Sequence, residues 1–371
     1  MSSLLTTVAE PRAERMQGAS THLRLDRWLT DSSIQRSDGA VGGWLDEDGV
    51  APYVYPEITG YYLQWLAWRA SEGETDIAFA ARAAAAQRWL RVWLAAGGPP
   101  VTRVFADATQ RDWRNQVVFT FDLAMVLRGL ASARRYGVLA PDAEIVDEVC
   151  RLLESLIASD GELDAVRVHR PSADFPRRWS TTRGPFLAKA AAGVLYAADT
   201  LPGISTRLRD AAEQTFVASI RALREHPHAE THPLLYAIEG YLNAPARPDF
   251  AAHLSIVGAC FDGLLAQSVA LARVPEAADD PGQARVDIVA QTLRVGALLA
   301  QHRRTAAAPF LRELERELED AVTDDGAVPF VAGATPLRRN AWTTMFASQA
   351  LAWMRVDKHA MADIAAAPLI V

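Results

Sequence analysis

Six segments of this chain are apolar around most of the circumference that a helix would have, and this pattern constrains the fold more than any other feature. A helix without a polar face must be covered on all sides, whereas an amphipathic helix keeps one face in solvent. Amphipathic segments, such as residues 75–96 and 206–224, alternate with the apolar ones. The alternation predicts two layers with the apolar helices inside. The expected inner helices begin near Pro56, Asn115, Gly184, Thr231, Asp287 and Asn340.

The clearest copy of the repeated unit is GGWLDEDGVAPYVYPEITGYYLQWLAWRA at residues 42–70. Asp48 and Gly49 predict a turn, and Pro56 suits the first turn of a helix because its missing N–H needs no partner there. Apolar side chains then recur at helical spacing. The unit therefore places a polar and aromatic rim at the N-terminal end of an inner helix. The members of this rim are Trp44, Asp46, Asp48, Tyr53, Tyr55, Glu57 and Thr59.

Six such helix pairs, closed into a ring, bury every inner helix without leaving an open end. The predicted fold class is therefore all-α: a single (α/α)6 toroid with six inner and six outer helices. Short extended turns are expected in the loops that enter the inner helices. We expect the toroid to span residues 21–366, after a flexible N-terminus at 1–20 and before a tail at 367–371.

Three segments resemble known proteins: YPEITGYYLQWL, THPLLYAIEGYL and RNAWTTMFASQALAWM. They look like the hairpins of six-hairpin α/α-toroid proteins associated with carbohydrate and polysaccharide metabolism. The resemblance covers residues 42–355 and implies the toroid fold. Because this fold hosts hydrolases, lyases and epimerases, the resemblance leaves the activity open.

Charge and composition exclude several function classes. A net charge of −7 over 371 residues and a pI near 5.7 argue against a nucleic-acid partner. No stretch approaches the roughly 18 uninterrupted apolar residues of a membrane span, and no secretory signal is visible. The two cysteines, Cys150 and Cys260, form no redox or ligand pair. We expect a cytoplasmic protein, and no cofactor, since Walker, Rossmann, Ser-elbow and CxxC motifs are absent.

The loops that enter the inner helices would converge on one mouth of the ring, where helix N-termini favour an anionic group. Glu57 and Asp112 are the leading acid/base candidates, because each lies beside aromatic residues that would raise a carboxyl pKa by desolvation. Two alternatives stay open. Glu57 also suits the dipole of a first helical turn, and Asp112 would pair equally well with Arg111 or Arg114.

A histidine and two tyrosines form a second set of candidates. In a lyase or epimerase, Tyr55 or His232 would transfer the proton in place of a carboxylate. Tyr236 lies four residues after His232 and would share its side of the helix. The preceding loop has residue types of a transition-metal site, although a pocket-lining role or a solvated loop is favoured and no metal is expected. The residues of this loop are His226, His228, Glu230 and His232.

Arginines in two of the loops predict an anionic ligand, because a guanidinium binds carboxylate, sulfate or phosphate through paired hydrogen bonds. Tryptophans at the same kind of junction suit stacking on a sugar ring. The alternative is that the arginines form ion pairs with acidic outer helices. The candidate binding residues are Trp113, Arg177, Arg178, Trp179, Arg183, Arg338, Arg339, Asn340 and Trp342, in addition to Trp44, Tyr53 and Thr59 of the rim.

The leading interpretation is an enzyme that acts on a small acidic carbohydrate derivative, with carboxylates transferring protons, arginines holding the acidic group and tryptophans orienting the ring. One alternative is a natural-product enzyme in which arginines hold a sulfate or phosphate leaving group while an amine closes on carbon, as in aziridine-forming proteins. That alternative predicts a partner subunit or carrier protein. The other is a non-catalytic protein whose mouth binds a ligand.

Overall fold

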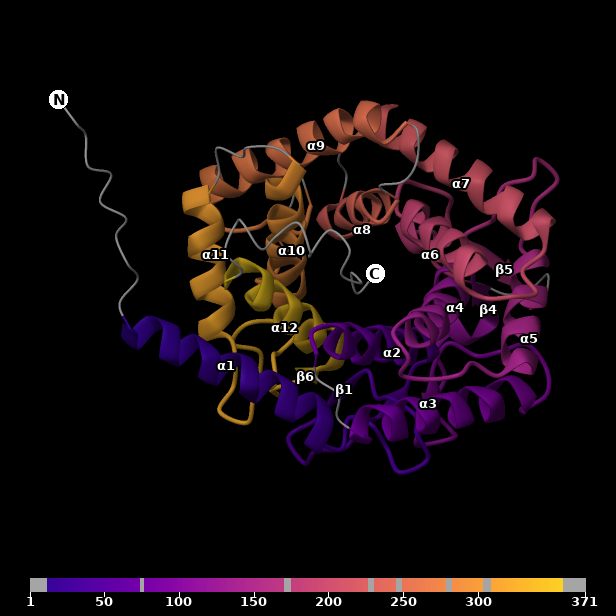
Figure 1. Ribbon diagram of the computed structural model, residues 1–371, viewed down its shortest axis with the longest axis horizontal. Coiled ribbons are helices and arrows are strands. Elements are labelled where there is room, and N and C mark those ends of the chain that lie inside the picture. Colours follow the sequence, from indigo (N-terminus) through magenta and orange to yellow (C-terminus); the bar gives the residue numbers. More distant parts are fainter. Residues whose placement is uncertain are drawn as a thin grey trace.

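The computed structural model describes residues 12–73, 77–169, 175–225, 230–244, 249–277, 282–302 and 308–355. Within these ranges the chain forms twelve α-helices in two nested rings (Figure 1). The inner ring consists of α2 (Pro56–Ser71), α4 (Thr120–Arg135), α6 (Leu187–Thr200), α8 (Thr231–Leu242), α10 (Val286–His302) and α12 (Ala341–Arg355). The outer ring consists of α1 (Arg12–Asp31), α3 (Ile77–Ala95), α5 (Ala143–Glu154), α7 (Thr206–Glu225), α9 (Phe250–Leu271) and α11 (Ala308–Asp320). The predicted (α/α)6 toroid is confirmed.

Neighbouring inner helices contact one another around the ring, and α12 closes it against α2. Helices α2 and α4 approach closely where Gly60 and Gly129 face each other. A Cβ atom on Gly60 would lie 2.5 Å from the backbone oxygen of Met125, and one on Gly129 would lie 2.5 Å from that of Gly60. Any larger side chain would push the two helices apart, so the missing Cβ atoms allow this spacing.

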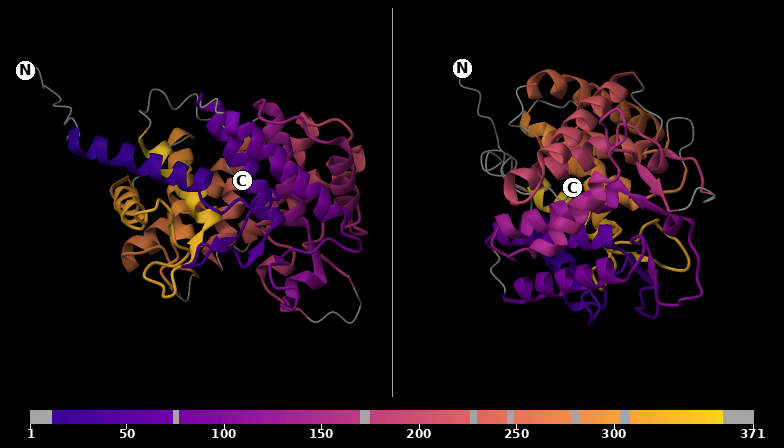
Figure 2. Two further views of the ribbon diagram at one scale, coloured as in Figure 1. Left: turned by 90° about the horizontal axis from the view of Figure 1, so that it is seen from below. Right: turned by 90° about the vertical axis from the view of Figure 1, so that its right-hand side faces the viewer.

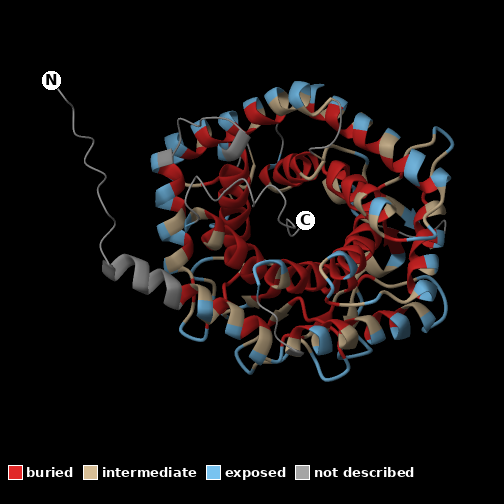
Figure 3. Cartoon of the chain, in the orientation of Figure 1, coloured by how far each residue is buried: buried red, intermediate tan, exposed pale blue. Residues whose placement is uncertain are grey.

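Burial separates the two rings as the sequence pattern predicted (Figure 3). In α2 every residue from Pro56 to Arg69 is buried, whatever its polarity. In α5 burial is confined to one face of the helix. The buried residues of α5 are Ile145, Val146, Val149, Cys150, Leu152 and Leu153.

Short antiparallel strand pairs link the loops before the inner helices. Strand β2 (Tyr53–Val54) pairs with β3 (Val104–Phe105), and β4 (Val117–Phe119) pairs with β5 (Val166–Val168). Strand β1 (Trp44–Leu45) pairs with β6 (Arg339–Asn340), so the first and last loops close the ring at the mouth. Side views show the strands and long loops gathered toward one end of the helices (Figure 2). The expected extended turns are therefore present.

Some boundaries differ from expectation. Helix α1 begins at Arg12, inside the segment expected to be flexible. Helix α4 begins at Thr120 and not near Asn115, because the 3₁₀ helix η1 (Trp113–Gln116) and strand β4 occupy the intervening residues. The expected tail at residues 367–371 lies outside the described residues.

Of the helices that the structure describes, α9 is long and apolar enough to cross a membrane by length and composition. Its mean hydropathy is 1.6 over a window of which 33% is buried. One such helix is weak evidence for a membrane span, because a core helix passes the same test.

Candidate active site

A cavity of about 480 Å³ opens among the loops and first turns of the inner helices. The predicted convergence of the entering loops is therefore observed, since the lining comes from segments preceding or starting α2, α4, α6, α8, α10 and α12. The sequence-predicted residues that line the cavity are Trp44, Tyr53, Tyr55, Glu57, Arg178, Trp179, His232, Tyr236, Asn340 and Trp342. Arg338, named with them, also lines it.

Two carboxyl groups lie on one wall of the cavity. Glu57 is in the first turn of α2 and Asp122 is in the first turn of α4, and their exposed fractions are 8% and 5%. The hydroxyl oxygen of Tyr55 lies 3.5 Å from Oδ1 of Asp122 and also forms a hydrogen bond with Glu57, so its single proton can be donated to either carboxyl group. The tyrosine therefore bridges the two carboxyl groups.

Burial raises the pKa of both carboxyl groups, because a low-dielectric environment disfavours their charged forms. For Asp122 the charge of Glu57 adds to burial, and the pKa lies well above its usual range. For Glu57, hydrogen bonds from Tyr55 and the positive charge of Lys189 oppose the effect of burial. The charge of Glu57 acts on Asp122, so ionising one carboxyl group makes the other harder to ionise.

His232 lies on the opposite side of the ring. It is in the first turn of α8, and the order of contacts around the inner ring places α8 across from α2. Burial, and then the charge of Arg285, lower the pKa of His232 to about 4, so the imidazole is neutral at neutral pH. Nδ1 lies 3.7 Å from Oδ2 of Asp287, and the ring packs against Tyr236 at a centroid distance of 4.2 Å. A neutral base therefore faces the carboxyl pair across the cavity.

A group of three arginines makes one side of the cavity positive. Arg103 and Arg114 both pair with Asp112, at 2.7 Å and 3.2 Å. The guanidinium of Arg114 lies 4.6 Å from the ring centroid of Trp113, and that of Arg178 lies 6.0 Å from the same centroid. Arg103 and Arg114 share the carboxylate of Asp112, and together with Arg178 beside Trp113 they form a group of three positive charges, which we call the arginine cluster.

Asp112 does not line the cavity, so its expected acid/base role has no support from its position. Its carboxylate accepts a hydrogen bond from the backbone N–H of Arg114 at 2.9 Å, which caps η1. Although burial alone would raise its pKa, that hydrogen bond and the charges of Arg103 and Arg114 lower it. The alternative interpretation, an ion pair with Arg114, is observed.

Arg183 and Arg339 have structural partners in place of a ligand. Arg183 forms ion pairs with three acidic residues of the loop between α5 and β5, Asp160, Glu162 and Asp164. Arg339 pairs with Asp325 at 3.0 Å and donates a hydrogen bond to the backbone carbonyl of Asp46. Ion pairing, the alternative interpretation of these arginines, therefore applies to both, although their partners lie in loops and not in outer helices.

The remaining predicted residues surround the cavity without lining it. Arg177 and Glu230 are exposed. Thr59 is fully buried and donates to the backbone carbonyl of Tyr55 at 3.0 Å. Trp113 supports the arginine cluster and packs edge-on against Phe119. His226 and His228 lie outside the described residues, and the structure describes no group of three or more His, Cys, Asp or Glu side chains arranged for a metal ion.

Sequence reasoning missed Asp122, Asp287, Arg103, Arg114 and Arg285 as lining residues. A signal for the two aspartates was available. Glu57, Asp122 and Asp287 are each the acidic residue in the first turn of an inner helix, so the reasoning that selected Glu57 extends to the other two. The arginines had no such signal, because their loops reach the cavity through strand pairing.

No protein-family model and no curated protein sequence matches the chain. Solved structures do match over nearly the whole length. Cellobiose 2-epimerase from Spirochaeta thermophila DSM 6192 has a TM-score of 0.65 at 15% identity, covering 93% of this chain and 99% of its own. D-mannose isomerase has a TM-score of 0.65 at 12% identity, covering 93% and 100%.

An unsaturated glucuronyl hydrolase specific for heparin has a TM-score of 0.60 at 11% identity, covering 94% of this chain and 97% of its own. Identities this low show the fold alone. The likeness to six-hairpin toroid proteins is confirmed at that level: this chain has the (α/α)6 toroid fold of carbohydrate-processing enzymes.

Proposed function

We propose that this protein is an enzyme that performs acid/base chemistry on a small anionic carbohydrate-like molecule held in the cavity. The observation that supports this most strongly is the buried pair Glu57 and Asp122, bridged by Tyr55, on the wall facing neutral His232. Groups with pKa values displaced in this way mark acid/base sites. Structures of the same fold are named as epimerase, isomerase and hydrolase.

The arginine cluster supports an anionic substrate. Arg103, Arg114 and Arg178 line the cavity, and two of them, Arg103 and Arg114, share the single carboxylate of Asp112. A carboxylate, sulfate or phosphate of the substrate would bind there through charged hydrogen bonds. Trp44, Trp179 and Trp342 line the same cavity and would stack on the sugar ring.

The two walls would supply both proton-transfer roles. The protonated member of the carboxyl pair would donate a proton to a leaving oxygen or to a developing carbanion. An ionised carboxylate or neutral His232 would accept the other proton, either from water in a hydrolase or from carbon in a lyase or epimerase. The hydrolase, lyase and epimerase reactions share an anionic sugar substrate and these two proton transfers.

Substitutions test the carboxyl pair directly. The assay compares uronates and sugar phosphates with neutral sugars of the same size. We expect Glu57→Gln and Asp122→Asn each to lower kcat by about 10²- to 10⁴-fold, while binding of the anionic ligand by calorimetry persists. Glu72→Gln and Asp48→Asn are matched controls, since both residues are exposed and outside the cavity. Full turnover in both site variants would overturn the proposal, and ligand binding without any turnover would identify a binding protein.

The arginine cluster also favours one second candidate, displacement of a sulfate or phosphate ester by an amine of the same molecule. The C–N bond would form as the C–O bond breaks, the anion would leave with the electron pair, and His232 would accept the ammonium proton. Release of inorganic sulfate or phosphate together with a ring-closed product would identify this reaction. It would also renew the expectation of a partner subunit or carrier protein.

A further inference from the structure

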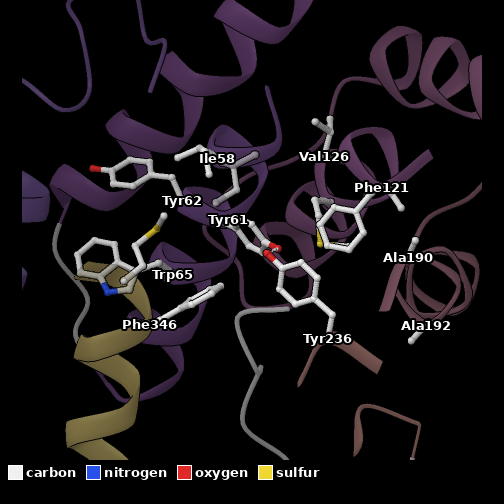
Figure 4. Close-up of a cluster of buried hydrophobic side chains, with 14 of the residues drawn as sticks. Ile58, Tyr61, Tyr62, Trp65, Phe121, Val126, Ala190, Ala192, Tyr236 and Phe346 are labelled. Carbon is white, nitrogen blue, oxygen red and sulfur yellow. Dashed lines mark hydrogen bonds between the residues drawn. The ribbon is translucent and has the colours of Figure 1, made fainter. Parts of the chain in front are cut away.

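Aromatic rings close the floor of the cavity. Phe121 of α4 stacks on Tyr236 of α8 at a centroid distance of 4.9 Å, and both residues line the cavity. The hydroxyl oxygens of Tyr236 and of Tyr61 on α2 lie 3.4 Å apart, so side chains of facing helices meet beneath the cavity (Figure 4). Such a floor suits the apolar face of a sugar ring, and binding of charged groups is left to the loops above it.

The cavity has two ends between its two walls. In the order of contacts around the inner ring, α2 and α4 lie opposite α8 and α10, and α6 and α12 separate these two pairs (Figure 1). The arginine cluster lies at the end nearest α4 and α6, because Trp113 precedes α4 and Arg178 precedes α6. The loop that enters α12 therefore forms the opposite end.

Arg338 lies in this opposite loop, on its cavity side. It lines the cavity, as does Asn340, whereas Arg339 between them pairs with Asp325 and does not line it. This alternation is expected for the extended chain at β6, where successive side chains face opposite sides. Strand β1 brings Trp44 opposite Asn340, and the guanidinium carbon of Arg338 lies 4.9 Å from the ring centroid of Trp44. A tryptophan face therefore holds Arg338 in the wall of the cavity.

The contacts of Arg338 leave its N–H donors available to a ligand. Stacking on a ring orients a guanidinium without using these donors. Arg338 is exposed and, among the residues that the structure describes, forms no ion pair. Glu47 contacts this corner by accepting a hydrogen bond from the backbone N–H of the preceding residue at 3.4 Å. By contrast, the lining residue Arg285 is held by Asp287 at 2.6 Å and by Glu276 at 3.0 Å.

We propose that Arg338, held on Trp44, forms a second anion-binding subsite opposite the arginine cluster, and that the substrate carries an anionic group at each end. The ligand class is an acidic sugar with two carboxylate, sulfate or phosphate groups, each bound by guanidinium hydrogen bonds. Anchoring at both ends places the sugar between the carboxyl pair and His232, where proton transfer requires it. The inference rests on the proposed function for the identity of the ligand as an anionic sugar.

Ligands of one size and different charge test the second subsite. Digalacturonate carries two carboxylates, and its monomethyl and dimethyl esters carry one and none. Calorimetry at neutral pH measures the Kd of each, and a hexose bisphosphate with its monophosphate repeats the comparison for phosphate groups on a single ring. We expect the wild-type protein to bind the ligand with two anionic groups about tenfold more tightly than the ligand with one, in at least one of the two series.

Variants assign the two ends of the cavity. Arg338→Gln should raise the Kd of the ligand with two anionic groups about tenfold and leave that of the ligand with one unchanged, because the arginine cluster still holds one group. Arg178→Gln should weaken both ligands. Arg209→Gln on outer helix α7 removes an exposed arginine that pairs with Asp199 away from the cavity. This control for net charge should keep the wild-type preference, and thermal unfolding checks that each variant is folded.

The outcomes separate this inference from the proposed function. Equal affinity of the wild-type protein for one and two anionic groups in both series would overturn the second subsite and leave the proposed enzyme intact. So would an equal loss for the two ligands in Arg338→Gln, or the same loss in Arg209→Gln. Binding that depends on Arg338 without turnover of any anionic sugar would support the subsite and contradict the proposed activity. If no anionic sugar binds, both proposals fail.

Discussion

The two walls of the cavity hold their acidic residues in different ways. On the α2–α4 wall, neither Glu57 nor Asp122 forms an ion pair within the described part of the chain, and burial raises the pKa of both. On the α8–α10 wall, Asp287 pairs with Arg285 at 2.6 Å and lies beside His232, whose pKa burial lowers. An acidic residue in the first turn of an inner helix therefore resists ionisation where burial dominates, as on the α2–α4 wall. It forms an ion pair where an arginine lies beside it, as on the α8–α10 wall.

Asp287→Asn should show the largest difference between the walls. The substitution removes the 2.6 Å ion pair of the largely buried Arg285, and because Glu276 remains 3.0 Å from that guanidinium we expect a loss of about 3 kcal/mol, the low end for breaking a buried pair. Asp122→Asn instead removes a group that resists ionisation, so the free energy of unfolding should be unchanged or higher. Urea unfolding at neutral pH measures both. Equal losses in the two variants would show that the walls do not differ.

The pH dependence of stability should have opposite signs on the two walls. His232 has its folded pKa lowered from about 6.5 to about 4, so its contribution is present above about pH 6.5 and lost as the pH falls, by about 3 kcal/mol at most. Glu57 and Asp122 have raised folded pKa values, so their contribution is present at low pH and lost as the pH rises through those values.

Urea unfolding between about pH 4 and pH 7 tests the histidine wall. His232→Gln should flatten the loss of stability on the acid side, because the variant has no imidazole to protonate. His253→Gln, on outer helix α9, is the matched control and should keep the wild-type slope. An unchanged slope in His232→Gln would contradict a buried neutral histidine.

The smallest effect concerns ligand binding at the arginines. Arg178→Ala removes a cation that lines the cavity, so the Kd of a uronate should rise about tenfold, which is about 1.4 kcal/mol. Arg183→Ala removes an arginine held in ion pairs away from the cavity and should leave Kd unchanged. Calorimetry at two salt concentrations checks both. An equal loss in the two variants would indicate a diffuse electrostatic effect in place of a defined anion site.

Much of the architecture could be predicted because helix periodicity is local. The segment that starts at Pro56 is apolar all round and is buried all round, while the amphipathic segment of α5 keeps a solvated face. The same local reasoning selected Glu57, Tyr55 and His232, which line the cavity. It selected Asp112 because the inner helix was expected to begin near Asn115. The 3₁₀ helix η1 and strand β4 occupy residues 113–119, so α4 begins at Thr120 and Asp122 is the acidic residue of its first turn.

By itself, the sequence determined the ring of six helix pairs and the polar aromatic rim at the helix entrances, since both follow from the spacing of side chains along a helix. Only the tertiary structure decided which charged side chains form ion pairs and with which partners. Arg183 pairs with Asp160 and Asp164 of the preceding loop, whereas Lys189 on α6 pairs with Glu239 on α8. Coulomb interactions depend on the distance between two charges and on their burial. Lys189 and Glu239 are 50 positions apart in the sequence, so only the closed ring brings them to 2.8 Å in a buried environment.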